Sequence, residues 1–192
     1  MQFIYFYIIL IDSRGINLPI LELKGKKPQI DETAYVSPQA TLIGDVKIGP
    51  NCSVWPGAIL RGDFASIKIE SDSHIQDSVI IHAHKKNNPV SIASYVTVET
   101  ASALYGCFIA DATVIGYGSI IFDGVNIGEA VFVAPNSYIP PGMIIQPRVV
   151  VKSEQIGLPA ATIRKLGMEE YTSQKERSER YSDVFTKLKN WI

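Results

Sequence analysis

The chain has 192 residues, of which 46% are hydrophobic and 19% are charged, and its formal net charge is −1 at pH 7. This length is enough for one domain with a hydrophobic core, and the balanced charge gives no electrostatic reason to expect nucleic acid or an anionic membrane as a partner. The two cysteines, Cys52 and Cys107, form neither a CxxC motif nor a disulfide framework, which predicts a cytoplasmic protein.

An apolar run, FIYFYIILI, occupies residues 3–11. The run is too short to cross a bilayer as a helix. It also lacks the basic region and the small-residue cleavage site of a secretory signal. We interpret residues 1–28 as an N-terminal segment that is either a β-strand or poorly ordered, with no membrane partner.

A six-residue aliphatic repeat runs through the central part of the chain. From Val36 the aliphatic positions recur in steps of six, except for a step of nine to Ile69, a step of eleven to Ile92 and a step of five to Ile109. Every position in the series is Val, Ile or Leu. The full series is Val36, Leu42, Ile48, Val54, Leu60, Ile69, Ile75, Ile81, Ile92, Val98, Leu104, Ile109, Ile115, Ile121, Ile127, Val133, Ile139 and Ile145.

This period is typical of a parallel β-helix, in which each unit is a short strand followed by a tight corner. The fourth residue after each repeat position is mostly small or β-branched, and glycine recurs near the turns. An amphipathic helix would show a period of 3.6, and a β-sandwich would alternate with period two. We therefore predict that residues 29–150 form an all-β, parallel β-helix domain of about six coils.

The last segment, residues 151–192, has a different composition. From residue 167 it is charged and poor in glycine, and its aromatic and aliphatic residues recur near helical spacing. We predict a connecting segment and then a C-terminal α-helix over roughly 168–190, packed along the coils or against a neighbouring subunit.

Several short motifs resemble the gamma-class carbonic anhydrases. They are LRGD at 60–63, IQD at 75–77, VIIHAH at 79–84 and GLPAATIR at 157–164. The resemblance covers about residues 28–170. It implies a left-handed β-helix and a homotrimer with a zinc ion at each subunit boundary, held by two histidines of one subunit and one of its neighbour.

The resemblance places the first zinc ligand at His82. The other two fall in a stretch that here reads VTVETASALYGC, so Thr100 and Tyr105 stand where the family has histidines. A threonine hydroxyl is a poor zinc ligand, and a tyrosine must first lose a proton with a reference pKa of about 10. We therefore expect no cofactor, unless zinc or iron occupies a site rebuilt from His82, His84, Glu99 or Cys107.

The resemblance also assigns roles to residues around this position. Arg61 and Asp63 would form an ion pair between subunits, and Gln76 and Asp77 would lie beside the site. In the family the glutamine orients the zinc-bound hydroxide, so Gln76 is the candidate catalytic residue. In this chain Gln76 alternatively satisfies backbone groups or Tyr105.

The repeat itself gives an independent geometric expectation. Leu60, Ile81 and Leu104 occupy the same strand of three successive coils, so the residues that follow them, Arg61, His82 and Tyr105, should stack on one outer face. Thr100 lies at a corner nearer the adjacent face. His74 lies at another corner, where we expect it to be exposed to solvent.

Together these observations predict a trimeric, gamma carbonic anhydrase-like protein that lacks the usual zinc site and therefore CO₂ hydratase activity. It would serve as a scaffold, or bind a small anion such as bicarbonate near Arg61. Two alternatives stay open. One is an active carbonic anhydrase, a lyase, with a rebuilt metal site. The other is a hexapeptide-type acyltransferase that uses coenzyme A, although the loop at 85–89 has no histidine beyond His84.

Overall fold

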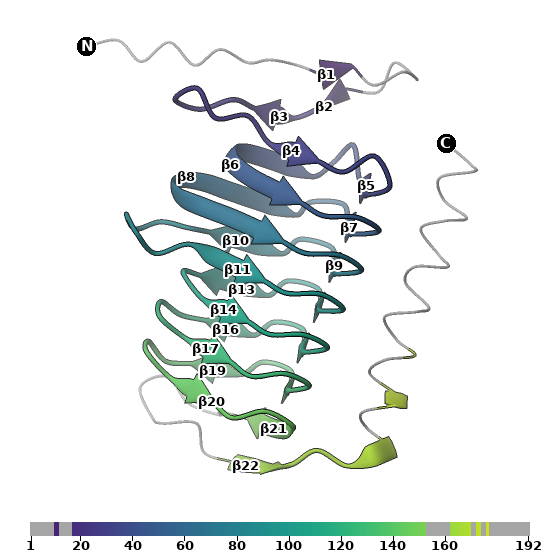
Figure 1. The fold of residues 1–192 in the computed structure, drawn as a ribbon, viewed down its shortest axis with the longest axis vertical. Helices are drawn as coiled ribbons and strands as arrows, with labels where there is room; N and C mark the ends of the chain where they lie inside the picture. Colours follow the sequence, from purple (N-terminus) through teal and green to yellow (C-terminus); the bar gives the residue numbers. More distant parts are fainter. Residues whose placement is uncertain (1–9, 12–16, 153–161, 170–171, 174–175, 177–192) are drawn as a thin grey trace.

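The computed structural model describes residues 10–11, 17–152, 162–169, 172–173 and 176. Short strands stack into a column of parallel coils, which confirms the predicted all-β solenoid (Figure 1). Before the column, β1 (Leu10–Ile11) and β2 (Asn17–Leu18) pair antiparallel.

Each coil contributes to three faces of the column. On the first face, β3 (Ile20–Leu21), β10 (Ile80–His82), β13 (Ala103–Tyr105), β16 (Ile120–Ile121) and β19 (Tyr138–Ile139) stack with the first halves of two long strands, β6 (Thr41–Ile48) and β8 (Ile59–Ile69). The second halves of β6 and β8 lie on the second face, with β4 (Gln29–Ile30), β11 (Val90–Ile92), β14 (Phe108–Ile109), β17 (Asn126–Ile127) and β20 (Ile144–Ile145).

The third face is a separate sheet of β5 (Tyr35–Val36), β7 (Ser53–Val54), β9 (His74–Ile75), β12 (Thr97–Val98), β15 (Val114–Ile115), β18 (Phe132–Val133) and β21 (Val149–Lys152). These strands stack in parallel, and β22 (Thr162–Lys165) then closes the sheet by pairing antiparallel with β21. Because each coil supplies one strand to this face, the column has about seven turns, slightly more than the repeat predicted.

The repeat positions form the core. Except for the half-buried Val36, every aliphatic position of the predicted series is at most 3% exposed. Fully burying such a side chain stabilises a fold by about 1.5–3 kcal/mol. The stacked aliphatic residues are therefore the main reason that the coils adopt one register.

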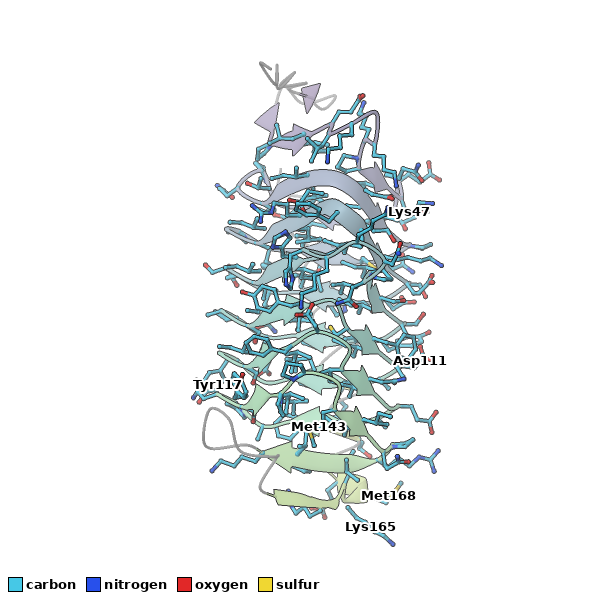
Figure 2. All side chains as sticks on the ribbon, turned by 90° about the vertical axis from the view of Figure 1, so that its left-hand side faces the viewer. Lys47, Asp111, Tyr117, Met143, Lys165 and Met168 are labelled. Carbon is cyan, nitrogen blue, oxygen red and sulfur yellow. The ribbon has the colours of Figure 1, made fainter. Side chains whose placement is uncertain are left out.

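All three irregular steps of the repeat fall at one corner, between the first and second faces. The step of nine adds a bulge at 63–66 in β8, since Gly44 pairs with Gly62 but Val46 pairs with Ile67. The step of eleven adds a hairpin at 85–88, which projects between β10 and β11 (Figure 1). The step of five shortens the turn at Gly106, between β13 and β14. We call this edge the irregular corner. It faces the viewer in Figure 2, with Tyr117 and Asp111 toward opposite sides.

The third face differs from the others because the side chains that point outward from it are buried. Val54, Ile75 and Val98 point into the core, so the residues before them point outward. Nevertheless Ser53, His74 and Thr97 are 0% exposed. The prediction that His74 is exposed is therefore wrong. A strand position can be assigned from the repeat, but the repeat does not reveal whether an outer face is covered.

His74 is also tied into its own face. Its Nδ1 lies 2.8 Å from the Ser53 hydroxyl, and the Trp55 indole N–H donates to the same hydroxyl at 2.8 Å. Trp55 in turn packs edge-on against the Tyr35 ring, with 6.1 Å between centroids. These contacts give His74 a structural role.

Most of the predicted C-terminal helix lies outside the described residues. Within the described ones, Met168, Glu169, Thr172, Ser173 and Glu176 are helical, and the Thr172 hydroxyl donates to the Met168 carbonyl at 3.0 Å. In the part of the chain that the structure covers, we find no helix that is long and apolar enough to cross a membrane.

The two thiols provide a test of the core. Burial raises the pKa of Cys52 and of Cys107 to about 12, and the Cys52 thiol also donates to the Glu70 carbonyl. Since only the thiolate reacts readily, we expect the native protein to resist a thiol reagent such as DTNB at pH 8. Both thiols should react at once in guanidinium chloride. Rapid reaction of the native protein would contradict the buried placement.

Candidate functional site

The predicted column of outward side chains is confirmed. In the ladder of β8, β10 and β13, His82 pairs with Arg61 on one side and with Tyr105 on the other. Leu60, Ile81 and Leu104 are 0% exposed and point inward, so the residue that follows each of them points outward. We call Arg61, His82 and Tyr105 the outward column.

Asp63 and Arg61 hold the imidazole of His82. The Nε2 atom of His82 lies 2.9 Å from Asp63 Oδ1 and 3.0 Å from Arg61 Nε. Arg61 Nη2 lies 3.2 Å from His82 Nδ1, and Arg61 Nε is 3.3 Å from Asp63 Oδ2. Arg61 and Asp63 thus form an ion pair within this chain, with His82 beside it.

The contacts of the His82 ring cannot all be hydrogen bonds at the same time. A neutral imidazole has one N–H, so Nε2 cannot donate to Asp63 and also accept from Arg61. Because a carboxylate is the stronger partner, we assign the proton to Nε2, which donates to Asp63. Nδ1 then accepts from Arg61 Nη2. Burial lowers the pKa of His82, the hydrogen bond to Asp63 raises it, and the charge of Arg61 lowers it, with a net shift downward from 6.5.

Gln76, Asp77 and Thr100 form a second group, at the corner that precedes β10 and β13. Gln76 is 6% exposed, and its Oε1 accepts from the backbone N–H and the hydroxyl of Thr100, both at 3.2 Å. Asp77 is exposed, and its backbone carbonyl accepts from the Ala101 N–H. Gln76 thus satisfies the backbone of Thr100 in the structure. Its buried Nε2 has no hydrogen-bond partner among the described residues.

The two groups are separated within one chain. His82 is the last residue of β10, whereas Gln76 precedes that strand. Tyr105 likewise ends β13, and Thr100 precedes it. The structure therefore brings together Arg61, Asp63 and His82, but it does not join them to Gln76, Asp77 and Thr100.

Tyr105 lies in a row of rings on the same face. Its ring is 5.5 Å from that of His84 in an edge-on arrangement and 5.7 Å from that of Phe122, and Phe122 is 4.9 Å from Tyr138. The rings of His82 and His84 are 5.4 Å apart. Such pairs stabilise one another beyond simple burial, so Tyr105 is held by packing along the column axis.

Asp123 is a residue that the sequence analysis missed. It accepts hydrogen bonds from Lys85 Nζ at 2.9 Å and from Asn88 Nδ2 at 2.7 Å, and it lies 3.5 Å from His84 Nε2. Asn88 reaches it across Gly106, where a Cβ atom would come within 2.0 Å of the Asn88 amide. The eleven-residue step in the repeat indicated the hairpin at 85–88. Nothing in the sequence indicated that this hairpin contacts Asp123, which lies two strands further along the same face.

His84 is turned toward the protein. Its Nε2 faces Asp123, and its Nδ1 is buried with no hydrogen-bond partner among the described residues. Among the described residues there is also no group of three or more His, Cys, Asp or Glu side chains that could hold a metal ion.

The chain is similar in sequence to two kinds of curated protein. It is 33% identical over 172 residues to gamma carbonic anhydrase 1, mitochondrial, of Arabidopsis thaliana, and this match covers 86% of the chain but 60% of the relative. It is 30% identical over 161 residues to the carnitine operon protein CaiE of Escherichia coli, covering 84% of the chain and 80% of CaiE. The chain thus spans about three fifths of the plant relative's length. No family model matches it.

Solved structures agree with the fold. The product of the BC4754 gene of Bacillus cereus, a candidate acetyltransferase, matches with a TM-score of 0.84 and 31% identity over 90% of this chain and 98% of that one. A hexapeptide transferase family protein of Anaplasma phagocytophilum matches with a TM-score of 0.79 and 29% identity, over 86% of this chain and 95% of that one. These matches confirm the left-handed β-helix.

The contacts of His82 predict opposite effects of two substitutions on its pKa. Asp63→Asn removes the carboxylate that favours the imidazolium, so the pKa should fall further. Arg61→Gln removes a neighbouring cation, so the pKa should rise. An NMR titration of the His82 ring nitrogens measures both. If neither variant moves the pKa, the cluster of three side chains does not form in solution.

Proposed function

The chain belongs to the gamma carbonic anhydrase-like family of hexapeptide-repeat proteins, and on this basis we propose that it is a trimeric binding protein without CO₂ hydratase activity. In this proposal the three-histidine zinc site is absent. The surface beside the outward column binds a small anion or supports assembly.

One observation carries the proposal: each residue at a family ligand position is engaged by its own chain. The Nε2 of His82 donates to Asp63 at 2.9 Å. Thr100 donates to Gln76, and the Tyr105 ring packs between His84 and Phe122. A zinc ligand needs a lone pair directed at the metal, so zinc would have to displace or compete with these contacts.

The donor set also does not fit zinc chemically. Catalytic zinc takes three protein ligands from His, Cys, Asp and Glu, and it leaves one position for water. His82, Thr100 and Tyr105 supply one imidazole and two hydroxyls. Without the metal, a water molecule keeps its high pKa and provides no hydroxide at neutral pH. Hydration of CO₂ therefore has no nucleophile in this proposal, and Gln76 has no hydroxide to orient.

A rebuilt metal site has little support from the remaining candidates. Cys107 is 3% exposed, and burial raises its pKa to about 12, so it stays a thiol. Glu99 accepts from the Tyr117 backbone N–H at 3.0 Å, and it lies next to Thr100, before β13 and away from His82. The Nδ1 of His84 is buried and its Nε2 faces Asp123. This arrangement argues against a role as the general base of an acyltransferase, which must offer a free nitrogen to its substrate.

An exposed aliphatic column supports the proposed trimer. Ile59 and Ile80 point outward from the first face and are 40% and 42% exposed. In the ladder they lie between Thr41 and Ala103, in one line with Ile120 and Tyr138. A continuous apolar line on a surface is typical of a contact between subunits. A second copy docked here would bring its own residues up to the outward column.

The compartment stays a prediction from cysteine usage, which favours the cytoplasm. The Arabidopsis relatives are named mitochondrial.

Metal content tests the proposal directly. We expect the purified wild-type protein to contain no stoichiometric zinc or iron after growth with either metal, and to give no CO₂ hydration above background. Thr100→His combined with Tyr105→His restores the family's donor set, so this variant should bind about one zinc per subunit. Elemental mass spectrometry measures both proteins.

The matched control adds His82→Ala to that double variant. It should lose the zinc again, because the restored site then lacks its third imidazole. One zinc or iron per wild-type subunit, together with rapid CO₂ hydration, would overturn the proposal and point to a rebuilt centre.

The aliphatic column gives a second prediction. Ile80→Glu places a charge in the proposed contact and should weaken the trimer at least about tenfold. Arg61→Ala should weaken it more mildly. Ile144→Glu is the matched control, because Ile144 is 67% exposed on the second face. Light scattering over a concentration series measures the mass. An Ile80→Glu protein that stays as associated as the control would remove this face from the interface.

A further inference from the structure

A cavity of about 310 Å³ opens at the irregular corner, next to the outward column. Its size is at the lower end of the range for small-molecule sites. Asp63 lines the cavity and also forms a hydrogen bond with His82. The residues that line it are Leu23, Lys24, Lys26, Asp45, Gly62, Asp63, Phe64, Ala65 and Lys86.

Most of this lining comes from the bulge of β8, from the inserted hairpin and from another hairpin that precedes the repeat. Asp63, Phe64 and Ala65 belong to the bulge of β8, which has no counterpart in β6. Lys86 lies on the inserted hairpin at 85–88, and Lys24 lies on a hairpin in which Leu23 pairs with Lys26. The aliphatic core keeps its register on both sides of the bulge and of the inserted hairpin. The core therefore does not require the side chains of these insertions, and they can contact a ligand.

The lining carries two cations without a carboxylate partner. Asp45 pairs with Lys26, and Asp63 is satisfied by Arg61 and His82. Neither Lys24 nor Lys86 forms an ion pair with a described residue. Their charges remain available to an anion.

Phe64 gives the cavity an apolar wall. Its side chain is 59% exposed, so the ring is accessible to the apolar part of a ligand. The Lys24 ammonium lies 5.6 Å from the centre of the Phe64 ring. Lys24 itself has a φ of 53°, in the left-handed region where a lysine is disfavoured. The turn thus holds a cation over the aromatic wall.

We propose that this cavity binds a small organic monocarboxylate, with its carboxylate near Lys24 and Lys86 and its apolar body against Phe64. The inference rests on the proposed function, because it assigns a ligand class to the surface beside His82 in a protein that binds rather than hydrates. An anion alone would need only the lysines. The exposed ring beside them is the observation that selects an anion with an apolar part.

Binding of straight-chain carboxylates to the full-length protein tests the proposal. Dissociation constants for acetate, butyrate and hexanoate, measured by ligand-observed NMR, should decrease roughly three- to fourfold for each buried methylene. Butyramide, which has nearly the same shape but no charge, should bind at least about tenfold more weakly than butyrate.

Two variants separate the two parts of the site. Phe64→Ala should abolish the dependence on chain length, and Lys86→Gln should reduce the preference for butyrate over butyramide. Lys47→Gln is the matched control, an exposed lysine on β6 outside the cavity, and it should bind like wild type.

Any of three results would overturn the inference. The first is that no carboxylate binds. The second is that all three carboxylates bind equally, in wild type as in Phe64→Ala. The third is that butyramide binds as well as butyrate. None of these results bears on metal content or CO₂ hydration, so the proposed function is tested independently.

Discussion

Burial of one aliphatic side chain per six-residue unit is the constraint on which the rest of the structure depends. Leu60, Ile81 and Leu104 must stack inward in successive coils, and a strand that points one residue in must point the next one out. The outward column of Arg61, His82 and Tyr105 is therefore a by-product of the core. Its vertical spacing is the distance between parallel strands, about 4.8 Å, which is short enough for rings and guanidinium groups to touch.

The same constraint determines where the chain can vary. An insertion in the middle of a face would move aliphatic residues out of the core, whereas an insertion where the chain turns from one face to the next leaves both faces in register. The bulge at 63–66 and the hairpin at 85–88 both fall at the irregular corner. Asn88 then reaches Asp123 over the bare backbone of Gly106. One edge of an otherwise repetitive column thus collects the cavity, the Asp123 cluster and the end of the outward column.

The chemistry of His82 follows from its neighbours. Beside a carboxylate and a guanidinium, and largely shielded from water, the imidazole stays neutral and directs its N–H at Asp63. A family scaffold that elsewhere supports a metal would here organise an arginine, a carboxylate and a row of aromatic rings. The guanidinium and the rings offer contacts for anions and apolar groups, and this is why binding rather than hydration is the function that we propose.

The sequence by itself determined the coil, the inward positions and the stacking of Arg61, His82 and Tyr105, because a strict period maps each residue to a face. It also marked the irregular steps. Only the tertiary structure decided which side chains meet across those steps: that Asp63 pairs with His82, and that Asp123 accepts from Lys85 and Asn88. It also decided that His74 is buried. The reason is physical. A repeat specifies position along and around the column, but contacts between insertions and the covering of an outer face depend on residues far apart in the chain.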